Sequence, residues 1–421
     1  MQGTSATPTR TAMHSSYWLP SARFNEFLQH LQQQGYEILG PTIVDGAIIY
    51  GLIRNINDLP QGWTDEQAPG QYRLHRRQDD FLFGYVVGPH SWKKYLFPSR
   101  LRLWEIHKEQ TQYRVEVHQE AVAKRAFLGM RGCELHALQV QDRVFLDRNG
   151  QVVDPHYESV RASTLLIGVE CTTVGANCFC TSMGTGPAIR KSVQVTNQPH
   201  ESKHHKAPRQ ALPMAQSTSS DVTTWVDIVL TEVADGFIVR IETELGGQVL
   251  QVMNLDPATP DQVNSGRGAV EHAANQISKH LDATHVQHVL QRNLEHPRWD
   301  DVATRCLGCT NCTMVCPTCF CVSVEEVTDL SLQTSARERV WDSCFNPDFA
   351  YVHGGNFRPH LSARYRQWLT HKFSTWWDQF EISGCVGCGR CITWCPVGID
   401  VTEEIKAIRM TDGATKTAAG G

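Results

Sequence analysis

Two copies of one cysteine run constrain the fold of this 421-residue chain more than any other feature. The run from Cys306 to Pro317 and the run from Cys385 to Pro396 both match C-x2-C-x2-C-x3-C-P without a mismatch. Three thiolates at this spacing can wrap a tight loop around three corners of an iron–sulfur cubane. In two-cluster proteins with this run, the fourth cysteine ligates the other cluster. The repeat therefore predicts two neighbouring [4Fe–4S] clusters that exchange their last ligand.

Crossed ligation assigns four cysteines to each cluster. We expect the first cluster on Cys306, Cys309, Cys312 and Cys395. We expect the second cluster on Cys385, Cys388, Cys391 and Cys316. The fourth cysteine of each run should open a helix toward the partner cluster, because the proline that follows suits an early helical position where no N–H is needed.

A pair of zinc sites is the alternative interpretation, since C-x2-C is also a zinc signature. Zinc takes four ligands per site and gives no reason for a third cysteine two residues on, or for the Cys-Pro that follows. The pattern therefore favours iron–sulfur clusters over a zinc-stabilised interaction module without redox chemistry. Visible absorbance that dithionite bleaches would exclude the zinc module.

Composition and the N-terminus limit where such a protein works. The chain has 15 cysteines, an odd number, and its first twenty residues lack the apolar stretch of a secretory signal. Thiols in the cytosol stay reduced, so metal ligation explains the cysteines better than disulfides do. The formal charge of −5 argues against a nucleic-acid binder, and no apolar run reaches the length of a membrane span. We expect a cytoplasmic protein with no nucleic-acid partner and no membrane span.

Residues 1–197 are expected to form an α/β domain. Short apolar runs on either side of Asp45-Gly46 predict a hairpin, whereas Leu59–Gln71, rich in proline and glycine, is interpreted as a loop. The apolar segments at 127–130 and 166–169, with a helical pattern between them, predict parallel strands of a βαβ unit.

Four cysteines follow the ends of these two strands. Open α/β sheets bind ligands at the carboxyl ends of their strands, so thiols there can converge. A third [4Fe–4S] cluster is a hypothesis that rests on Cys133, Cys171, Cys178 and Cys180. The alternative is that these are buried, reduced thiols, as free cysteines often are. About eight iron atoms per chain would reject the third cluster and about twelve would support it.

The rest of the chain divides by composition. Residues 198–222 are rich in His, Ser and Gln and predict a polar insertion or linker. Residues 223–297 are expected to continue the N-terminal domain, with a hairpin around Asp235-Gly236 and a helix over Gly268–Leu294. Residues 298–421 are expected to form a ferredoxin-like domain. The predicted fold is thus α+β or α/β, with an N-terminal α/β domain followed by a two-[4Fe–4S] domain that carries a long helical insert.

The insert lies between Cys316 and Cys385, and we interpret it as a surface for docking or for shielding the clusters. Cys319, Cys321 and Cys344 fit no spacing rule for a complete site. A structural or shielding role is favoured for them over ligation, and both remain open.

Signatures of other chemistry are missing. The chain has no P-loop, no strand-linked G-x-G-x-x-G, and no evident Ser–His–Asp or paired-carboxylate arrangement. We therefore expect a non-catalytic electron-transfer part of an oxidoreductase complex. A stand-alone flavin enzyme is another alternative, which bound flavin in the isolated chain would favour.

Several stretches resemble one family. They are FLGMRGCELHALQVQDRVF (127–145), CFCTSMGTGP (178–187), CLGCTNCTMVCPTCFC (306–321) and CVGCGRCITWCPVGID (385–400). Together they resemble the iron–sulfur β subunits of soluble group 3 nickel–iron hydrogenases (sulfhydrogenases) and the similar A subunit of anaerobic sulfite reductase. The resemblance extends from about residue 61 to residue 408, and the 198–220 segment is longer than the family pattern.

The resemblance implies a relay function. Such a subunit passes electrons between a flavin- and NAD(P)-binding subunit and a second catalytic unit. In the hydrogenase branch, which we prefer, that unit is the small iron–sulfur subunit with the nickel–iron subunit. In the alternative branch it is a sirohaem subunit of sulfite reductase.

Overall fold

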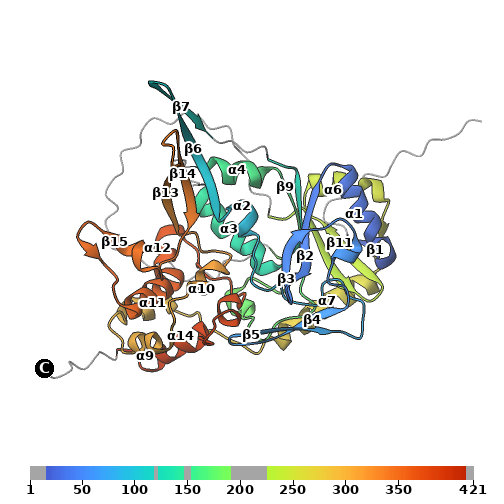
Figure 1. Ribbon diagram of the computed structural model, residues 1–421. Coiled ribbons are helices and arrows are strands. Elements are labelled where there is room, and N and C mark those ends of the chain that lie inside the picture. Colours follow the sequence, from blue (N-terminus) through green and yellow to red (C-terminus); the bar gives the residue numbers. More distant parts are fainter. Residues whose placement is uncertain (1–15, 118–121, 147–152, 191–224, 414–421) are drawn as a thin grey trace, which may run out of the picture.

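The computed structural model describes residues 16–117, 122–146, 153–190 and 225–413. It confirms the expected fold class, with an α/β part at the N-terminal side and a cysteine-rich part that contains the C-terminal helices (Figure 1). The predicted polar linker at 198–222 lies outside the described residues.

A mixed eight-stranded sheet forms the centre of the α/β part. Its order is β12 (Asp256–Pro257), β1 (Ser16–Pro20), β11 (Gly236–Ile241), β10 (Ile228–Val233), β9 (Thr164–Val169), β8 (Arg125–Met130), β2 (Glu37–Val44) and β3 (Ala47–Leu52). The four strands β10, β9, β8 and β2 run parallel, and the outer strands pair antiparallel. Both predicted hairpins, β2–β3 and β10–β11, are therefore confirmed.

Burial explains the parallel centre of this sheet. Every residue of β9 and all but the first of β8 are buried, as expected for strands covered on both faces. The predicted βαβ unit is confirmed, with α3 (Gly132–Phe145) and α4 (Pro155–Ala162) between the two strands. The remaining helices of this part are α1 (Phe24–Gln33), α2 (Lys93–Leu96), α5 (Cys180–Met183), α6 (Glu244–Leu250) and α7 (Pro260–Gln276), with short turns of 3-10 helix at Ser21–Arg23, Ile56–Asp58 and Gln251–Met253.

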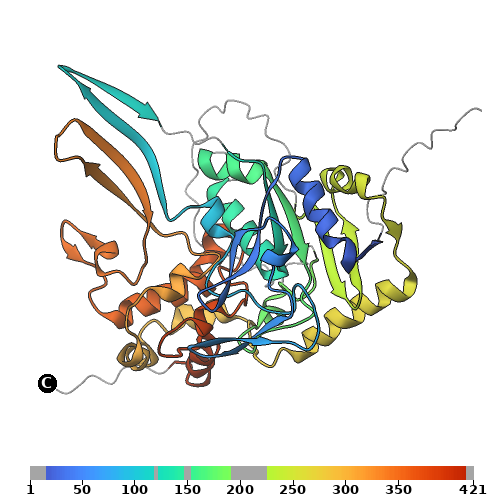
Figure 2. The same ribbon diagram turned by 45° about the vertical axis from the view of Figure 1, so that its right-hand side comes forward.

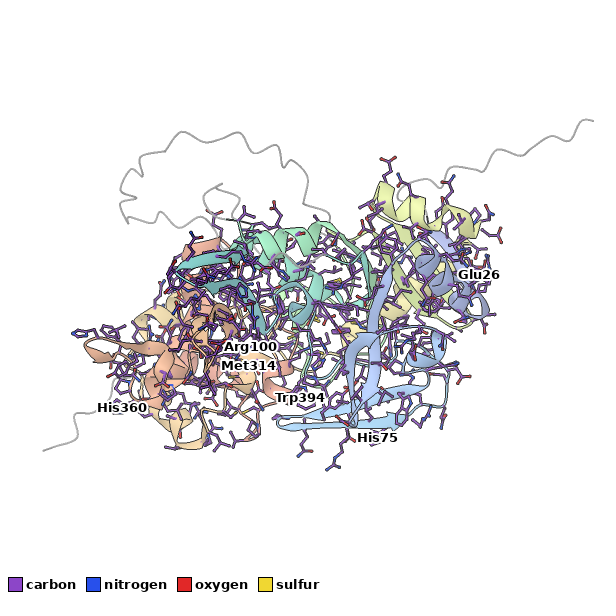
Figure 3. The ribbon with its side chains drawn as sticks, turned by 45° about the horizontal axis from the view of Figure 1, so that its top comes forward. Glu26, His75, Arg100, Met314, His360 and Trp394 are labelled. Carbon is purple, nitrogen blue, oxygen red and sulfur yellow. The ribbon has the colours of Figure 1, made fainter. Side chains whose placement is uncertain are left out.

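The loop predicted at Leu59–Gln71 is wrong. This segment contains β4 (Trp63–Ala68), which pairs with β5 (Gln71–Arg76) in a two-stranded ribbon. The strand residues are mostly polar, so they gave no apolar run to recognise. The ribbon's turn packs on the cysteine-rich part, because Gly70 donates its N–H to Ile392 O at 3.0 Å. Trp394, labelled in Figure 3 beside this ribbon, packs against Tyr72 with ring centroids 5.3 Å apart.

A four-stranded antiparallel sheet projects from the body of the molecule (Figures 1 and 2). It is built in the order β13 (Val322–Thr328), β14 (Thr334–Trp341), β6 (Arg100–Glu109) and β7 (Gln112–Val117). The insert between the cysteine runs supplies β13 and β14, and the N-terminal part supplies β6 and β7. The insert therefore contains a β-hairpin in addition to the expected long helix.

Helices form a second core around the cysteine runs. The insert's helix is continuous from α11 (Leu361–Thr370) through a π-helical segment, η5 (His371–Thr375), to α12 (Trp376–Phe380). It shares a core with helices that precede and follow the insert in the sequence. These are α8 (Val286–Arg292), α9 (Arg298–Arg305) and α14 (Val401–Met410). The short elements η4 (Pro347–Ala350), β15 (Tyr351–Val352) and β16 (Gly355–Asn356) precede it.

The single helix predicted over Gly268–Leu294 is wrong in its extent. α7 begins earlier, at Pro260, and ends at Gln276, and α8 begins only at Val286. Thr259 caps α7 through a reciprocal side-chain and backbone pair with Gln262, a signal that marks the true start.

None of the helices in the described ranges is long and apolar enough to cross a membrane.

Candidate functional site

The two cysteine runs fold into matching loops. In the first loop Gly308 and Thr310 have positive φ, and in the second Gly387 and Gly389 do, at the equivalent positions. These left-handed residues turn the chain tightly, which is why three of the four are glycine. Each loop then enters one short helix, α10 (Asn311–Met314) or α13 (Arg390–Thr393).

The expectation that the fourth cysteine opens a helix is wrong. The third cysteine of each run, Cys312 or Cys391, lies inside the short helix, and the fourth comes after the helix has ended. Pro317 follows an irregular segment, and the next helix after Pro396 is α14, which begins at Val401. A cysteine beyond the helix end can reach back to the other run without the helix geometry fixing its direction.

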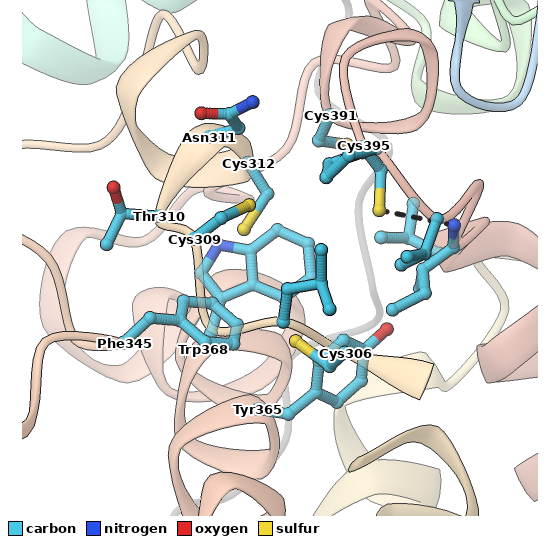
Figure 4. A pocket seen from close by; sticks show the side chains of 15 residues that line it. Cys306, Cys309, Thr310, Asn311, Cys312, Phe345, Tyr365, Trp368, Cys391 and Cys395 are labelled. Carbon is cyan, nitrogen blue, oxygen red and sulfur yellow. Dashed lines mark hydrogen bonds between the residues drawn. The ribbon is translucent and has the colours of Figure 1, made fainter. Parts of the chain in front are cut away.

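The first loop shares a pocket with the last cysteine of the second run. Figure 4 shows the side chains of Cys306, Cys309, Cys312 and Cys395 around one space, with Cys391 on its border. The aromatic rings of Phe345, Tyr365 and Trp368 complete the wall. Cys309 is exposed, so this pocket reaches the protein surface.

Backbone N–H groups point at sulfur in both loops. Gly308 N lies 3.4 Å from Cys306 Sγ, and Gly387 N lies 3.4 Å from Cys385 Sγ. Ile399 N lies 3.3 Å from Cys395 Sγ, the contact drawn as a dashed line in Figure 4. Donors aimed at sulfur stabilise thiolate, the form that binds metal.

Cys316, from the first run, lies with the second loop. Burial raises the pKa of Cys385 to about 12, and the thiols of Cys388 and Cys316 contribute to the increase. The thiol of Cys316 likewise contributes to raising the pKa of Cys388 and the pKa of Cys391. Both fourth cysteines therefore lie beside the opposite run.

The four remaining candidates gather next to the second loop. Cys133 lies in the first turn of α3 and Cys171 follows β9, so both lie beyond the carboxyl ends of neighbouring parallel strands, as predicted. Burial raises the pKa of Cys180 well above its usual value, and the thiols of Cys178 and Cys171 add to the increase. The thiol of Cys388 also contributes to raising the pKa values of Cys133, Cys178 and Cys180.

Close backbone packing brings this group to the second loop. Phe179 donates its N–H to Gly387 O at 2.9 Å, and a Cβ on Gly387 would lie 2.7 Å from the Phe179 backbone. A side chain at Gly132 would meet Thr185 O at 2.8 Å, so α3 can begin here only with glycine. These two contacts fix Cys133 and Cys180 beside the loop that carries Cys388.

A buried ion pair joins α3 to the second loop. Arg390 donates to Glu134 at 2.5 Å, and both side chains are at most 4% exposed. The other Glu134 oxygen accepts from Tyr50 Oη at 2.6 Å and from Trp92 Nε1 at 3.2 Å. Both carboxylate oxygens of Glu134 are therefore hydrogen-bonded, and the buried arginine has a partner of opposite charge.

The donor set fits iron–sulfur clusters better than single metal ions. In the described ranges, no three His, Cys, Asp or Glu side chains lie close enough together to hold one metal ion. A tetrahedral zinc site needs four donors, with sulfur about 2.3 Å from the ion. Thiols set apart around a shared space match a larger group, and thiolates are the ligands that such clusters use.

Buried polar atoms without a partner surround the cysteines. Tyr365 Oη and Trp368 Nε1, in the wall of the first pocket, form no hydrogen bond with the described residues. Near the third group the same holds for Thr181 Oγ1, next to Cys180, and for Nε of Arg131, whose side chain bonds to Cys171. Buried donors are normally satisfied, so these atoms fit acceptors supplied by a bound group.

The three unassigned cysteines form thiol contacts close to Cys316. A hydrogen bond from Cys319, together with the charge of Lys372, holds the pKa of Cys316 well below its usual range. A hydrogen bond with Cys344 lowers the pKa of Cys321 to about 7. These contacts leave the predicted choice between shielding and ligation untested.

Two buried lysines beside the thiols were missed by sequence reasoning. Lys372 lies in η5, and Lys93 begins α2; each is 4% exposed. The only signal for Lys372 is its position among apolar residues of the insert's helix, which is a weak indication of function. Arg390, inside the second run, was passed over because the pattern fixes only its cysteines.

Comparisons with known proteins agree with the cysteine pattern. Residues 305–399 match the description of a 4Fe-4S dicluster domain. The β subunit of sulfhydrogenase 2 from Pyrococcus furiosus is 26% identical over 402 residues, which cover 94% of this chain and 97% of that protein. No solved structure matches. The similarity over nearly the whole length of both chains confirms the resemblance to sulfhydrogenase β subunits that the cysteine motifs indicated.

Proposed function

We propose that this protein is an iron–sulfur electron-transfer subunit that carries two [4Fe–4S] clusters on the two cysteine runs. The first cluster takes Cys306, Cys309, Cys312 and Cys395, and the second takes Cys385, Cys388, Cys391 and Cys316. Bound clusters of this type accept and donate single electrons. The chain's own residues hold them side by side and leave the first nearer the surface, because Cys309 is exposed whereas Cys316 is buried.

One observation carries this proposal: each fourth cysteine lies with the opposite loop. Cys395 borders the first pocket, and Cys316 acts on the three thiols of the second loop. Crossed ligands bring two clusters close together, which permits fast electron transfer between them. A zinc module has no need of this exchange.

We extend the proposal to a third cluster on Cys133, Cys171, Cys178 and Cys180. The support is the gathering of these thiols beside Cys388, together with unpaired buried donors at Thr181 and Arg131. A cluster there would continue the relay from the exposed first site, through the second, into the α/β part.

The partners follow from the similarity to a sulfhydrogenase β subunit. We propose that electrons pass between a flavin- and NAD(P)-binding subunit and a nickel–iron hydrogenase module in the cytoplasm. The A subunit of anaerobic sulfite reductase, which would feed a sirohaem subunit, remains the second candidate. A neighbouring gene for a nickel-binding large subunit would favour the first assignment, and one for a sirohaem protein would favour the second.

The test is to count clusters in the isolated, anaerobically purified chain and then to delete them one at a time in the complex. Iron analysis and EPR of the reduced protein should give about eight iron atoms per chain, or about twelve with the third cluster. Cys309→Ala or Cys388→Ala should remove one cluster and stop electron flow between the partners. Each partner's own half-reaction with an artificial dye should continue.

Cys344→Ala is the matched control, because it removes a neighbouring cysteine outside the proposed ligand sets. Unaltered NAD(P)-linked turnover in Cys309→Ala or Cys388→Ala would contradict the relay. Loss of the partners' dye-linked activities as well would show that the cysteine holds the assembly together instead.

A further inference from the structure

The buried ammonium of Lys372 touches the sulfur of a proposed cluster ligand. Its Nζ lies 3.3 Å from Cys316 Sγ and 3.6 Å from Cys319 Sγ. It also lies 3.1 Å from Thr318 Oγ1 and 3.1 Å from Gly384 O. An ammonium has three donors and no acceptor, and this shell consists of groups that can accept hydrogen bonds.

No carboxylate among the described residues neutralises this charge through an ion pair with Lys372. A buried cation without an anion is strongly unfavourable, so its compensation must come from nearby sulfur. Lys93 is a second buried lysine nearby: its Nζ lies 3.5 Å from Thr313 O and 3.9 Å from the centroid of the Trp341 ring, and the thiols of Cys319, Cys316 and Cys321 act on it electrostatically. Two buried cations therefore face one group of cysteines.

The first pocket is different. Its wall contains aromatic and aliphatic side chains, and no lysine or arginine is among the described residues that line it. Arg364 is not among the residues that line this pocket. Its charge lowers the pKa of Cys306, and its Nη1 donates to Phe345 O at 2.7 Å. The two matched loops thus place their sulfurs in unlike electrostatic surroundings.

We propose, on the basis of the function proposed above, that Lys372 sets the reduction potential of the second cluster and holds it above that of the first. Reduction adds one negative charge to a cluster. A fixed cation and an N–H···S hydrogen bond in a buried, low-dielectric site stabilise that added charge. Electrons arriving at the exposed first cluster would therefore move inward to the second.

The π-helical segment is what aims this lysine. η5 widens the helix between α11 and α12 at His371–Thr375, and π-helical turns often occur at functional sites. The local geometry directs Lys372 at Cys316 and at Gly384, which directly precedes the second run. Lys372 is thus a positioning residue for electron transfer, because it acts through the cysteine that holds the cluster.

The test is a potentiometric titration of the full-length protein within its complex, followed by EPR. In Lys372→Met, the ratio of reduced to oxidised second cluster at a fixed potential should fall at least tenfold, equivalent to about 59 mV for one electron. Lys372→Gln retains N–H donors without the charge and should give a smaller shift in the same direction. The first cluster, titrated in the same sample, should not move.

Lys94→Met is the matched control, since Lys94 Nζ contacts Tyr50 O at 3.2 Å and His90 Nδ1 at 3.2 Å rather than sulfur. It should leave both potentials unchanged. Two clusters with unshifted potentials in Lys372→Met would overturn this inference alone. Loss of second-cluster iron in both Lys372 variants would overturn it too, by making the lysine an assembly residue. Absence of two clusters from the unmodified protein would instead reject the proposed function.

Discussion

The loops of the two cysteine runs have the same backbone and different surroundings. Both contain two left-handed residues at equivalent positions and a short helix that carries the third cysteine. Around the first loop, the chain places Phe345, Tyr365 and Trp368 and leaves Cys309 exposed. Around the second, it places Lys372 of the insert and the buried face of α3, whose Glu134 pairs with Arg390 of the loop itself.

This difference shows which parts of the chain determine which property. The repeated runs dictate the loop geometry and the supply of thiols. The insert and the α/β part, which are not repeated, dictate charge, burial and access. A motif can therefore specify that a cluster binds while its neighbours specify what the cluster does.

The largest effect should come from breaking the exchange of ligands between the loops. Cys395→Ser should eliminate the EPR signal of the first cluster, although Cys395 belongs to the second run, because its thiol borders the first pocket. Cys316→Ser should remove the second cluster in the same way. Iron should fall by about four atoms per chain in each variant. Loss of the second cluster in Cys395→Ser would contradict crossed ligation.

Serine substitutions in the α/β part test whether a third cluster lies beside the second loop. Cys178→Ser, or Cys133→Ser, should lower iron from about twelve to about eight atoms per chain while both loop clusters keep their signals. Cys344→Ser is the control and should lose none. An iron content of about eight in the unmodified protein would mean that these buried thiols hold no cluster.

Much of this organisation could be predicted from the cysteines and the apolar runs. The spacing indicated the crossed sets, and β8 and β9 were recognisable because strands buried on both faces are continuously apolar. Cys133 and Cys171 could be placed together because the carboxyl ends of parallel strands share one edge of a sheet.

The missed features depend on polar or non-local contacts. β4 reads as loop because its residues are polar, and its packing on the second run at Gly70 involves residues more than 300 positions away. The pairing of β14 with β6 also joins residues that are remote in sequence, such as Thr334 and His107. Lys372 looks like an ordinary helix residue until the π-helical segment places it on Cys316.

Breaking the ion pair between α3 and the second loop should lower stability strongly without unfolding the protein. Glu134→Gln would leave Arg390 buried without its partner, which typically costs about 3–5 kcal/mol. The midpoint temperature of thermal unfolding of the holoprotein should fall markedly. Asp412→Asn is the matched control, because its pair with Arg292 is largely exposed and surface ion pairs contribute little to stability. Equal shifts in the two variants would mean that this buried link does not hold the loop.

The smallest effect concerns the first pocket and separates two reasons for an unpaired hydroxyl. Tyr365 Oη is buried and without a partner in the described structure, and the ring lies in the pocket wall (Figure 4). If the hydroxyl donates to a bound cluster, Tyr365→Phe should lower the potential of the first cluster by less than about 59 mV, a change of under tenfold in the reduced fraction. The potential of the second cluster should not change.

If the hydroxyl has no acceptor at all, removing it should leave both potentials unchanged and should keep or increase stability, because a buried unsatisfied polar group is itself unfavourable. Potentiometry together with thermal unfolding of the same variant distinguishes the two cases, and a shift of the second cluster alone would contradict the separation of the two surroundings.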